Sequence, residues 1–197
     1  MGMFDRIKDQ AKASLQQAQG ARSSSGAPGA HGAPGAHGAH GAPGASRSSG
    51  GSKAQLVGVL KSQLSSLKTE LKSGAFRDAS MAVCALVAAA DGYVDPAERQ
   101  QLESLILSND VLQNFPPDQL RTRFNKHVDL LAADFARGKA EAMQEVAKAA
   151  KKPAEARAVV QTGIVVAGAD GYIAPAEDQI LREVCAALGL SPTEFGF

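Results

Sequence analysis

The sequence contains almost the same nine-residue turn twice. Residues 90–98 read Ala-Asp-Gly-Tyr-Val-Asp-Pro-Ala-Glu, and residues 169–177, 79 positions later, read Ala-Asp-Gly-Tyr-Ile-Ala-Pro-Ala-Glu. An apolar run of helical length precedes each copy, and an amphipathic segment follows it. Asp-Gly ends a helix readily, and Pro is favoured at the start of the next one. The repeated unit is therefore helix, acidic turn, helix, and we expect an internal pseudo-two-fold repeat in the fold.

Composition favours an all-α fold. The chain has 197 residues, of which 44% are hydrophobic and only 5% aromatic, with no Trp. Such small side chains suit packed helices better than a β-sandwich. The apolar periodicity predicts a compact bundle of about seven helices, with two buried central ones at residues 76–90 and 154–169. The other predicted helices run from Leu56 to near Gly74 and over residues 96–108, 117–135, 139–151 and 175–188, with Gly138 as a separator and a last turn from Ser191.

Three segments differ in composition. Residues 1–19 form an amphipathic pattern, with Phe4 and Ile7 on one face and Arg6 and Lys8 on the other, which predicts a short docking helix. Residues 20–52 are rich in Gly, Ala, Pro, Ser and His, and residues 53–197 contain the helical domain. The docking helix has three possible targets, namely a partner, the domain itself or an anionic membrane surface.

Glycine occupies every third position from Gly26 to Gly44, as it does in collagen. Seven triplets with few Pro residues are too short to hold three chains together, so we interpret residues 20–52 as a disordered linker. Its histidines, His31, His37 and His40, suggest weak metal binding as an alternative to simple low complexity.

Charge and hydropathy exclude several classes of protein. The net charge is +1, and residues 53–197 carry 16 Lys and Arg against 18 Asp and Glu, without a basic patch for nucleic acid. The longest apolar run, residues 81–90, is about half of a membrane span, and the first residues have no signal-peptide pattern. We therefore expect a cytoplasmic protein with no direct membrane span. Cys84 and Cys185 lie in apolar runs, which favours free buried thiols over a disulfide.

The acidic turns have a structural and a metal-binding interpretation. In the first copy Asp95, Pro96 and Glu98 match the cap, first and third positions of a helix. The second copy has Ala174 at the cap position, so the retention of Asp170 and Glu177 suggests another role. Carboxylates on both arms of a turn suit a hard cation such as Ca²⁺, Mg²⁺ or Mn²⁺. The candidate ligands form one shared site or two similar ones, from Asp91, Glu98, Asp170 and Glu177.

Two known metal motifs do not fit. The spacing of the acidic residues differs from that of an EF-hand. A di-iron bundle needs Glu-x-x-His twice, whereas His127 is the only histidine in the predicted domain and has Phe124 three residues before it. We expect His127 to be an exposed or half-buried helix residue rather than a ligand.

Several segments together resemble the TerB family of tellurite-resistance proteins. They are the two Ala-Asp-Gly turns, Phe-Asn-Lys-His-Val at 124–128, Asp-Phe-Ala-Arg-Gly-Lys at 134–139, Pro-Ala-Glu-Ala at 153–156, Gly-Ile-Val-Val-Ala at 163–167 and the ending at 188–195. The resemblance covers about residues 76–195, and Met-Phe-Asp-Arg-Ile-Lys at 3–8 also resembles the family's amino terminus. The Gly-rich insert departs from the family pattern.

The resemblance implies a helical domain with internal pseudo-symmetry and an acidic cluster proposed to bind divalent metal. It implies a role in bacterial stress complexes beside the membrane protein TerC and TerD-type calcium-binding proteins, and no catalytic activity. The same motif match assigns the site to Asp91, Glu98, Asp170 and Glu177, with Asp95 and Asp178 as weaker members because neither has an acidic counterpart in the other copy.

We therefore expect a non-enzymatic, metal-responsive interaction module in the cytoplasm, at the inner face of the membrane. A purely structural adaptor without a metal site is the main alternative. A metal-dependent hydrolase ranks lower because no nucleophile, phosphate-binding loop or histidine ligand accompanies the turns. Direct chemistry on a tellurium oxyanion calls for reactive thiols or clustered cations, which the sequence does not supply.

Overall fold

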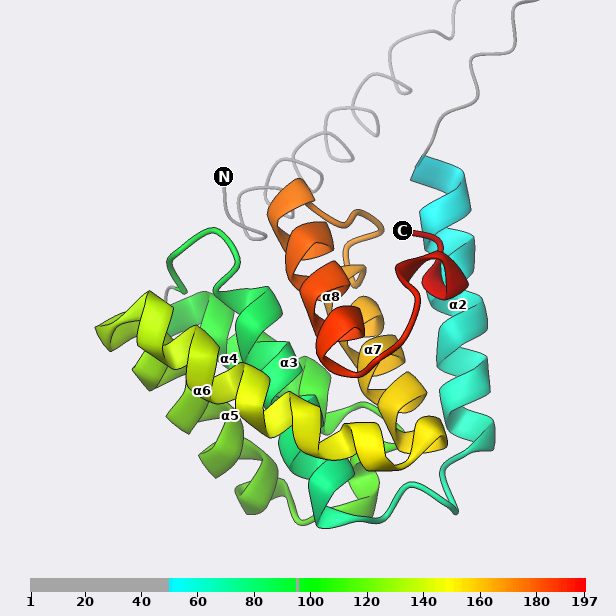
Figure 1. Cartoon of the computed structure of the whole chain (residues 1–197), viewed down its shortest axis with the longest axis horizontal. Coiled ribbons are helices and arrows are strands. Elements are labelled where there is room, and N and C mark those ends of the chain that lie inside the picture. The colour runs from blue at the N-terminus through cyan, green and yellow to red at the C-terminus, as the bar shows by residue number, and fades with distance from the viewer. Residues whose placement is uncertain (1–49, 95) are drawn as a thin grey trace, which may run out of the picture.

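A computed structural model describes residues 50–94 and 96–197, and every regular element in these ranges is helical (Figure 1). The predicted all-α bundle of about seven helices is confirmed. The predicted docking helix at residues 1–19 and most of the predicted linker lie outside the described residues. The α-helices are α2 Gly50–Ser66, α3 Gly74–Ala88, α4 Pro96–Leu107, α5 Pro117–Ala133, α6 Phe135–Ala147, α7 Pro153–Ala167 and α8 Pro175–Ala187, and the 3₁₀ turns are η1 Leu112–Asn114, η2 Lys148–Lys151 and η3 Pro192–Phe195.

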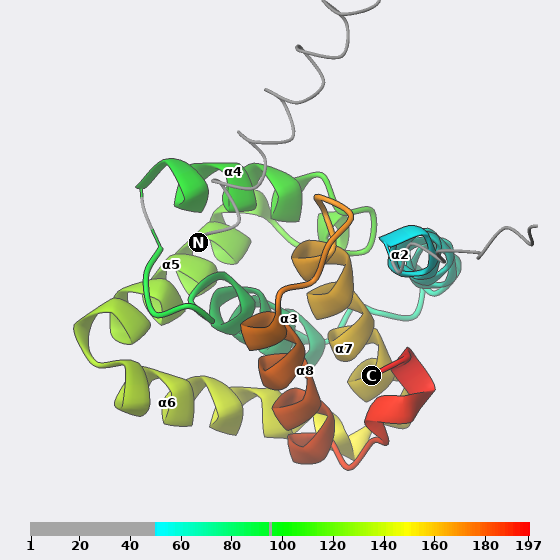
Figure 2. The same ribbon diagram turned by 90° about the horizontal axis from the view of Figure 1, so that it is seen from above.

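Helices α3 and α7 form the centre of the bundle (Figure 2). Helix α3 packs against α5, α6, α7 and α8, while α7 packs against α2, α3 and α8. Every residue from Ser80 to Ala88 is buried, as the continuous apolar run predicted. The two central helices approach closely at Gly163, where an added Cβ would lie 2.4 Å from Val83 Cγ1. Their contact therefore depends on the absence of a side chain at this position.

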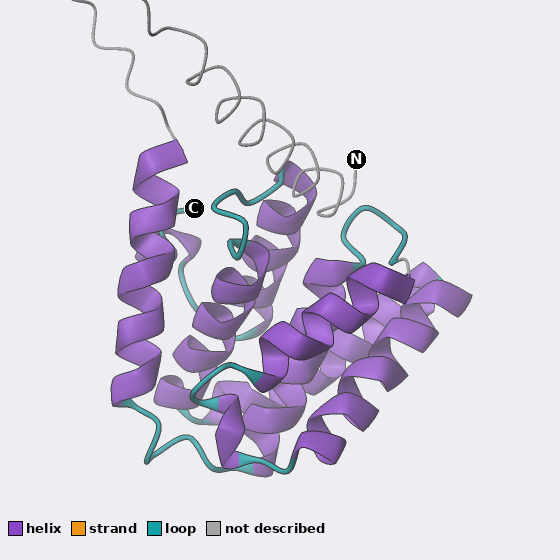
Figure 3. Ribbon diagram, turned by 180° about the vertical axis from the view of Figure 1, so that it is seen from behind, coloured by secondary structure: helices purple, strands orange, loops and turns teal. Residues whose placement is uncertain are grey.

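The two helices that follow the acidic turns differ in their surroundings. Helix α8 packs against α3, α6, α7 and η3, and five of its residues are buried. Helix α4 packs against α5, α7 and η1, and buries Glu98, Leu102 and Ile106. The view from behind shows the same arrangement, with loops at both ends of the bundle (Figure 3). The sequence repeat is thus placed in two different environments.

Helix α2 begins and ends earlier than the sequence pattern predicted. It starts at Gly50, inside the predicted linker, and ends at Ser66 rather than near Gly74. Residues 67–70 form a turn instead, while Leu71 remains fully buried. The Asn114 side-chain amide donates hydrogen bonds to the carbonyl oxygens of Lys68 and Leu71, at 2.5 and 3.1 Å. This distant side chain satisfies the carbonyls that a longer helix would have used internally.

The prediction that Gly138 separates two helices was wrong. The break lies at Asp134, whose extended backbone (φ −155°, ψ 103°) ends α5 and starts α6. Its Oδ1 accepts a hydrogen bond of 3.0 Å from the backbone N–H of Arg137, as an N-cap does. Gly138 instead lies within α6, where a Cβ would come within 2.7 Å of the Leu130 backbone. Glycine is therefore required by the close approach of the two helices.

Candidate site at the acidic turns

The two acidic turns follow the same backbone path. The residue that caps the end of helix α3 is Ala89 (φ −92°, ψ 10°), and the one that caps α7 is Gly168 (φ −89°, ψ 13°). Two turn glycines then adopt left-handed conformations, with φ of 93° at Gly92 and 84° at Gly171. These values favour glycine strongly. The sequence repeat is therefore also a repeat of local structure, while a two-fold relation of the whole domain stays a prediction.

The turn aspartates both accept a backbone hydrogen bond. Asp91 Oδ1 accepts from the N–H of Tyr93 at 3.3 Å, and Asp170 Oδ1 accepts from the N–H of Tyr172 at 2.9 Å. A contact two residues ahead is the Asx-turn, which stabilises a reversal of the chain. The side chains hold the turn as well as placing negative charge on it, because Asp91 is exposed and Asp170 half-buried.

The glutamates of the repeat are buried beneath the turns. Glu98 and Glu177 are 6% and 5% exposed, each in the first turn of its helix. Glu177 Oε2 accepts a hydrogen bond of 2.6 Å from the backbone N–H of Ala174. This is the half of a capping box in which the third helical residue reaches back to the cap residue. The second copy therefore keeps this half of the capping box, and Ala174 at the cap position does not by itself show that Glu177 is retained for another role.

The two weaker candidate ligands are Asp178 and Asp95. Asp178 forms an ion pair of 2.6 Å with Arg182 Nε, one helical turn further along α8. A cation bound at Asp178 would have to compete with that guanidinium. Asp95 lies outside the described residues.

The structure does not gather the candidate carboxylates into a single group. Both turns lie at the same end of the bundle but are separated in the two perpendicular views (Figures 1 and 2). In the ranges 50–94 and 96–197, no three His, Cys, Asp or Glu side chains form a group that could hold a metal ion. Of the two expected arrangements, the shared four-carboxylate site is not formed, which leaves one candidate site at each turn.

A small pocket lies beside the first turn, which sequence reasoning did not predict. It has a volume of about 130 Å³. Tyr93 stands at this pocket with 69% of its surface exposed, and Tyr172 at the matching position of the other turn is 48% exposed. The pocket joins the turn to the last part of α5, and its lining consists of Ala89, Gly92, Tyr93, Val94, Val128, Leu131 and Ala132.

Comparison with known proteins identifies the family of the domain. The family model described as "Tellurite resistance protein TerB" matches residues 77–197, which is more than half of the chain. The chain belongs to the TerB family. No curated protein and no solved structure gave a match. Family membership suggests a function related to tellurite resistance.

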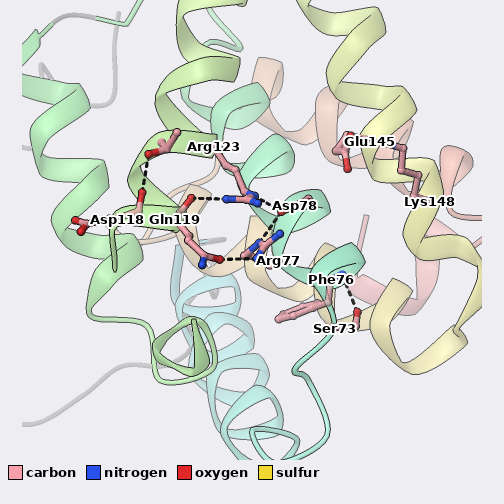
Figure 4. A network of polar contacts seen from close by, with 10 residues as sticks. Ser73, Phe76, Arg77, Asp78, Asp118, Gln119, Arg123, Glu145 and Lys148 are labelled. Atoms are coloured by element: carbon pink, nitrogen blue, oxygen red, sulfur yellow. Dashed lines mark hydrogen bonds and ion pairs between the residues drawn. The ribbon is translucent and has the colours of Figure 1, made fainter. Parts of the chain in front are cut away.

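The TerB domain also contains a polar network that the sequence did not reveal. Asp78 on α3 forms ion pairs with Arg77 and Arg123, and Arg77 donates a hydrogen bond of 2.6 Å to Gln119 Oε1 (Figure 4). Burial alone would raise the pKa of Asp78, but the hydrogen bonds and charges of the two arginines lower it. The network joins α3 to α5. We interpret it as structural because its charges are paired within the domain.

The thiols of the TerB domain are unsuited to redox chemistry at neutral pH. Cys84 and Cys185 are both free and buried, as the sequence predicted. Burial raises the pKa of Cys84 to about 12 and that of Cys185 to about 11. Because the thiolate is the reactive form, both thiols are poor nucleophiles.

The structure corrects the sequence prediction for His127. His127 is buried rather than exposed or half-buried, with no hydrogen-bond partner at Nδ1. Its side chain faces the interior because α5 packs against both α3 and α6. In the part of the chain that is described, no helix is long and apolar enough to cross a membrane.

Proposed function

We propose that this TerB protein is a non-enzymatic stress-response module of tellurite resistance that binds a divalent cation at its acidic turns. Cation binding would regulate its interactions with protein partners at the inner face of the bacterial membrane. TerC-like membrane proteins and TerD-like proteins are the proposed partners, and the cytoplasm is the proposed location. Ca²⁺, Mg²⁺ and Mn²⁺ are the candidate ions, because all of them prefer oxygen ligands.

The observation that carries this proposal is the duplicated turn with its local excess of negative charge. Residues 88–98 contain Asp91, Asp95 and Glu98, and residues 168–178 contain Asp170, Glu177 and Asp178. Neither stretch contains a Lys or Arg. The same backbone geometry presents the leading aspartate of each stretch at the rim of the bundle. A hard cation would reduce the repulsion within each stretch.

The proposed sites are open ones. Ca²⁺ takes about six to eight oxygen ligands. One aspartate (Asp91 exposed, Asp170 half-buried), a buried glutamate and nearby backbone carbonyls supply fewer at each turn, so water or a partner would complete the coordination. An acidic side chain of a partner protein is the ligand that best explains how metal binding at a turn would regulate assembly.

Calorimetric titration of Ca²⁺, Mg²⁺ and Mn²⁺ tests the metal half of the proposal. The informative variant is the double substitution Asp91→Asn with Asp170→Asn, because the Asn side-chain oxygen still accepts the backbone N–H of the turn. We expect binding in the parent protein and its loss in the double variant. The matched control is Asp118→Asn, which removes a charge from a side chain that is 95% exposed on α5. No heat of binding in the parent protein would remove the metal from the proposal.

Thermal unfolding gives an independent measure of the same sites. A ligand that binds only the native state at 100 times its Kd stabilises that state by about 2.7 kcal/mol. We expect one of the three ions to raise the unfolding temperature of the parent protein and of Asp118→Asn. The double Asn variant should show no rise.

The partner half requires a separate experiment. Capture of proteins from bacterial membrane fractions on the immobilised chain, with and without a chelator, compares the two states of the turns. We expect recovery of partners to fall when the chelator is present. Equal recovery in both conditions would show that metal does not control the interaction.

A structural adaptor without metal is the second candidate function. It is favoured by the hydrogen bonds that Asp91, Asp170 and Glu177 already make to the backbone. Under this alternative the carboxylates only shape the turns. The double Asn variant distinguishes the two, because the adaptor predicts unchanged partner recovery and no effect of any cation.

A further inference from the structure

The pocket beside the first acidic turn is suited to one hydrophobic side chain. Its volume of about 130 Å³ is close to the roughly 150 Å³ of an apolar protein cavity that holds a benzene molecule. Its lining is apolar apart from the Tyr93 hydroxyl and the backbone. The pocket opens beside Tyr93, which is largely exposed. An aromatic ring that entered it would bury its own surface and part of Tyr93.

We propose that this pocket is the docking site of the chain's own amino-terminal segment, residues 3–15, with Phe4 in the pocket. The segment lies outside the described residues, and the inference uses only its sequence. Phe4, Ile7, Ala11 and Leu15 recur at the spacing of one helical face. Residues 16–49 contain no other aromatic or large aliphatic residue, so this segment holds the only such anchors of residues 1–49 besides Met1.

The charges around the pocket complement those of the segment. The two described stretches that line it, residues 87–94 and 127–135, contain Asp91, Asp129 and Asp134 and no Lys or Arg. In the segment, Arg6 and Lys8 flank Ile7, and Lys12 follows one turn later, against Asp5 and Asp9. A basic side chain next to the anchor would lie near the exposed Asp91, whereas Asp129 is already paired with Arg99 Nη1 at 2.7 Å. This complementarity favours the segment over an acidic or neutral peptide.

The tether has the length that this docking needs. Helix α2 begins at Gly50, at the same end of the bundle as the first turn (Figure 1). A flexible Gly-rich chain of 34 residues has a root-mean-square end-to-end distance of roughly 30 Å. A domain of this size has a radius of gyration of about 15 Å, so the tether reaches across its end. Tethering raises the effective concentration of the segment to about the millimolar range, so an intrinsic binding free energy of about −4 kcal/mol gives half occupancy. One buried apolar side chain contributes about 1.5–3 kcal/mol, so Phe4 needs the contacts of the rest of its helical face as well.

Docking at this pocket would place the segment against the same turn that carries Asp91. The proposal does not require a metal, because it rests on the apolar lining and the tether. It can therefore hold or fail independently of the proposed cation sites.

Paramagnetic relaxation in the full chain tests the proposal. A nitroxide is attached at Gln10→Cys; Cys84 and Cys185 are buried, so they stay unlabelled. We expect loss of amide signal intensity at Tyr93, Val94 and Leu131, restored when the nitroxide is reduced. The pocket-filling substitution Ala132→Trp should abolish the loss. Its control, Ala133→Trp, changes the adjacent exposed residue, which does not line the pocket, and should preserve the loss.

Three further comparisons identify the occupant. Phe4→Ala with Ile7→Ala should abolish the signal loss, which would show that the hydrophobic face and not the tether places the label. A mixture of labelled unenriched chain with unlabelled ¹⁵N chain should show no loss, and a loss there would assign the pocket to a second copy instead. In the third comparison anionic vesicles are added to the labelled chain, and binding of the segment to the vesicles with the turn signals unchanged would overturn the proposal. Absence of signal loss at the turn in the labelled full chain would overturn it too. So would a signal loss that persists in Ala132→Trp.

Discussion

The carboxylate of Glu177 accepts a hydrogen bond of 2.6 Å from the backbone N–H of Ala174. Alanine has no side-chain acceptor, so this contact is the only half of the capping box that the second acidic turn forms. The buried position of Glu177 means that the contact is shielded from water. In a complete capping box two side chains accept backbone N–H groups. In the second turn only Glu177 does so, and the start of α8 therefore depends on this one side chain.

Replacement of Glu177 by Ala should destabilise the domain. The substitution removes the acceptor of the Ala174 N–H, and an unsatisfied backbone group away from water costs about 1–3 kcal/mol. Chemical denaturation measures the loss as a lower midpoint. The control Glu183→Ala removes a carboxylate of the same helix that is paired with Lys139 near the surface, where an ion pair contributes about 0–1 kcal/mol. Equal losses in the two variants would contradict the capping role.

Completion of the capping box should stabilise the second turn. Ala174 has the extended backbone of a cap residue, with φ −69° and ψ 155°, and is half-buried. Ala174→Ser supplies a hydroxyl that can accept from the first turn of α8, and such a cap contributes typically about 1 kcal/mol. The unfolding midpoint should rise accordingly. Ala176→Ser, two residues later and inside the helix, should give no comparable rise.

Substitution of either turn glycine should destabilise the fold because of its backbone conformation, and not because of a steric clash. Gly92 and Gly171 have φ of 93° and 84°, and an added Cβ at either would meet no atom within 4 Å. Ala at either position should still destabilise the fold by about 1–2 kcal/mol, because the left-handed region is unfavourable for L-residues. Gly58→Ala is the control, since that helical glycine is also open but has an ordinary backbone; it should stabilise the fold slightly.

The local parts of the fold could be predicted from the sequence because their causes are local. The apolar runs of α3 and α7 and the Asp-Gly turns with their following Pro residues predicted helices and turns that the structure contains. The end of α2 was mispredicted for a non-local reason, and the start of α6 was mispredicted because Gly138 rather than the N-cap Asp134 was taken as the break. The Asn114 amide, 46 residues from Lys68, satisfies the carbonyls after α2, and the crossing of α6 over Leu130 determines the position of Gly138.

For the candidate site, too, the local features could be predicted from the sequence and the tertiary ones could not. The sequence predicted which carboxylates each turn contains, but whether the turns meet depends on how α4 and α8 pack, and these helices have different neighbours. The pocket could not be predicted either, because Tyr93 and Val128 line it from segments far apart in the chain. The buried role of Glu177 was missed because a capping box was sought through its cap residue alone.

The two turns differ in the residue two positions before the aspartate, and this difference affects how α2 packs against α7. The first copy has Ala89 where the second has Gly168, and a Cβ at Gly168 would lie 2.5 Å from Val57 Cγ2 on α2. Gly168→Ala should therefore push α2 from α7 and destabilise the domain, by about 1–3 kcal/mol as overpacked sites do. Val57→Ala removes the obstructing methyl groups, so the double variant should lose less than the sum of the two single changes. Simple additivity would show that α2 does not pack tightly there.

The free energy of unfolding should fall as the pH drops below the pKa that His127 has in the unfolded chain, because His127 is buried in the folded protein. Burial lowers the pKa of His127, with the charge of Lys126 adding to the effect, while Glu145, Glu141 and Asp78 oppose it. The folded state therefore binds a proton less readily than the unfolded state, whose histidine has a pKa of about 6.5. The stabilisation is fully present above that pH and decreases below it, until the folded state is protonated as well.

His127→Phe should flatten this dependence between about pH 6.5 and pH 5, a range above the pKa of ordinary carboxylates. Phenylalanine is of similar size and carries no titratable group, and Nδ1 of His127 has no hydrogen-bond partner to lose. Urea denaturation of both proteins across this range gives the two slopes. His31, His37 and His40 are present in both proteins, so a difference in slope reports His127 alone. Parallel slopes would show that protonation of His127 is equally easy in the folded and unfolded chains.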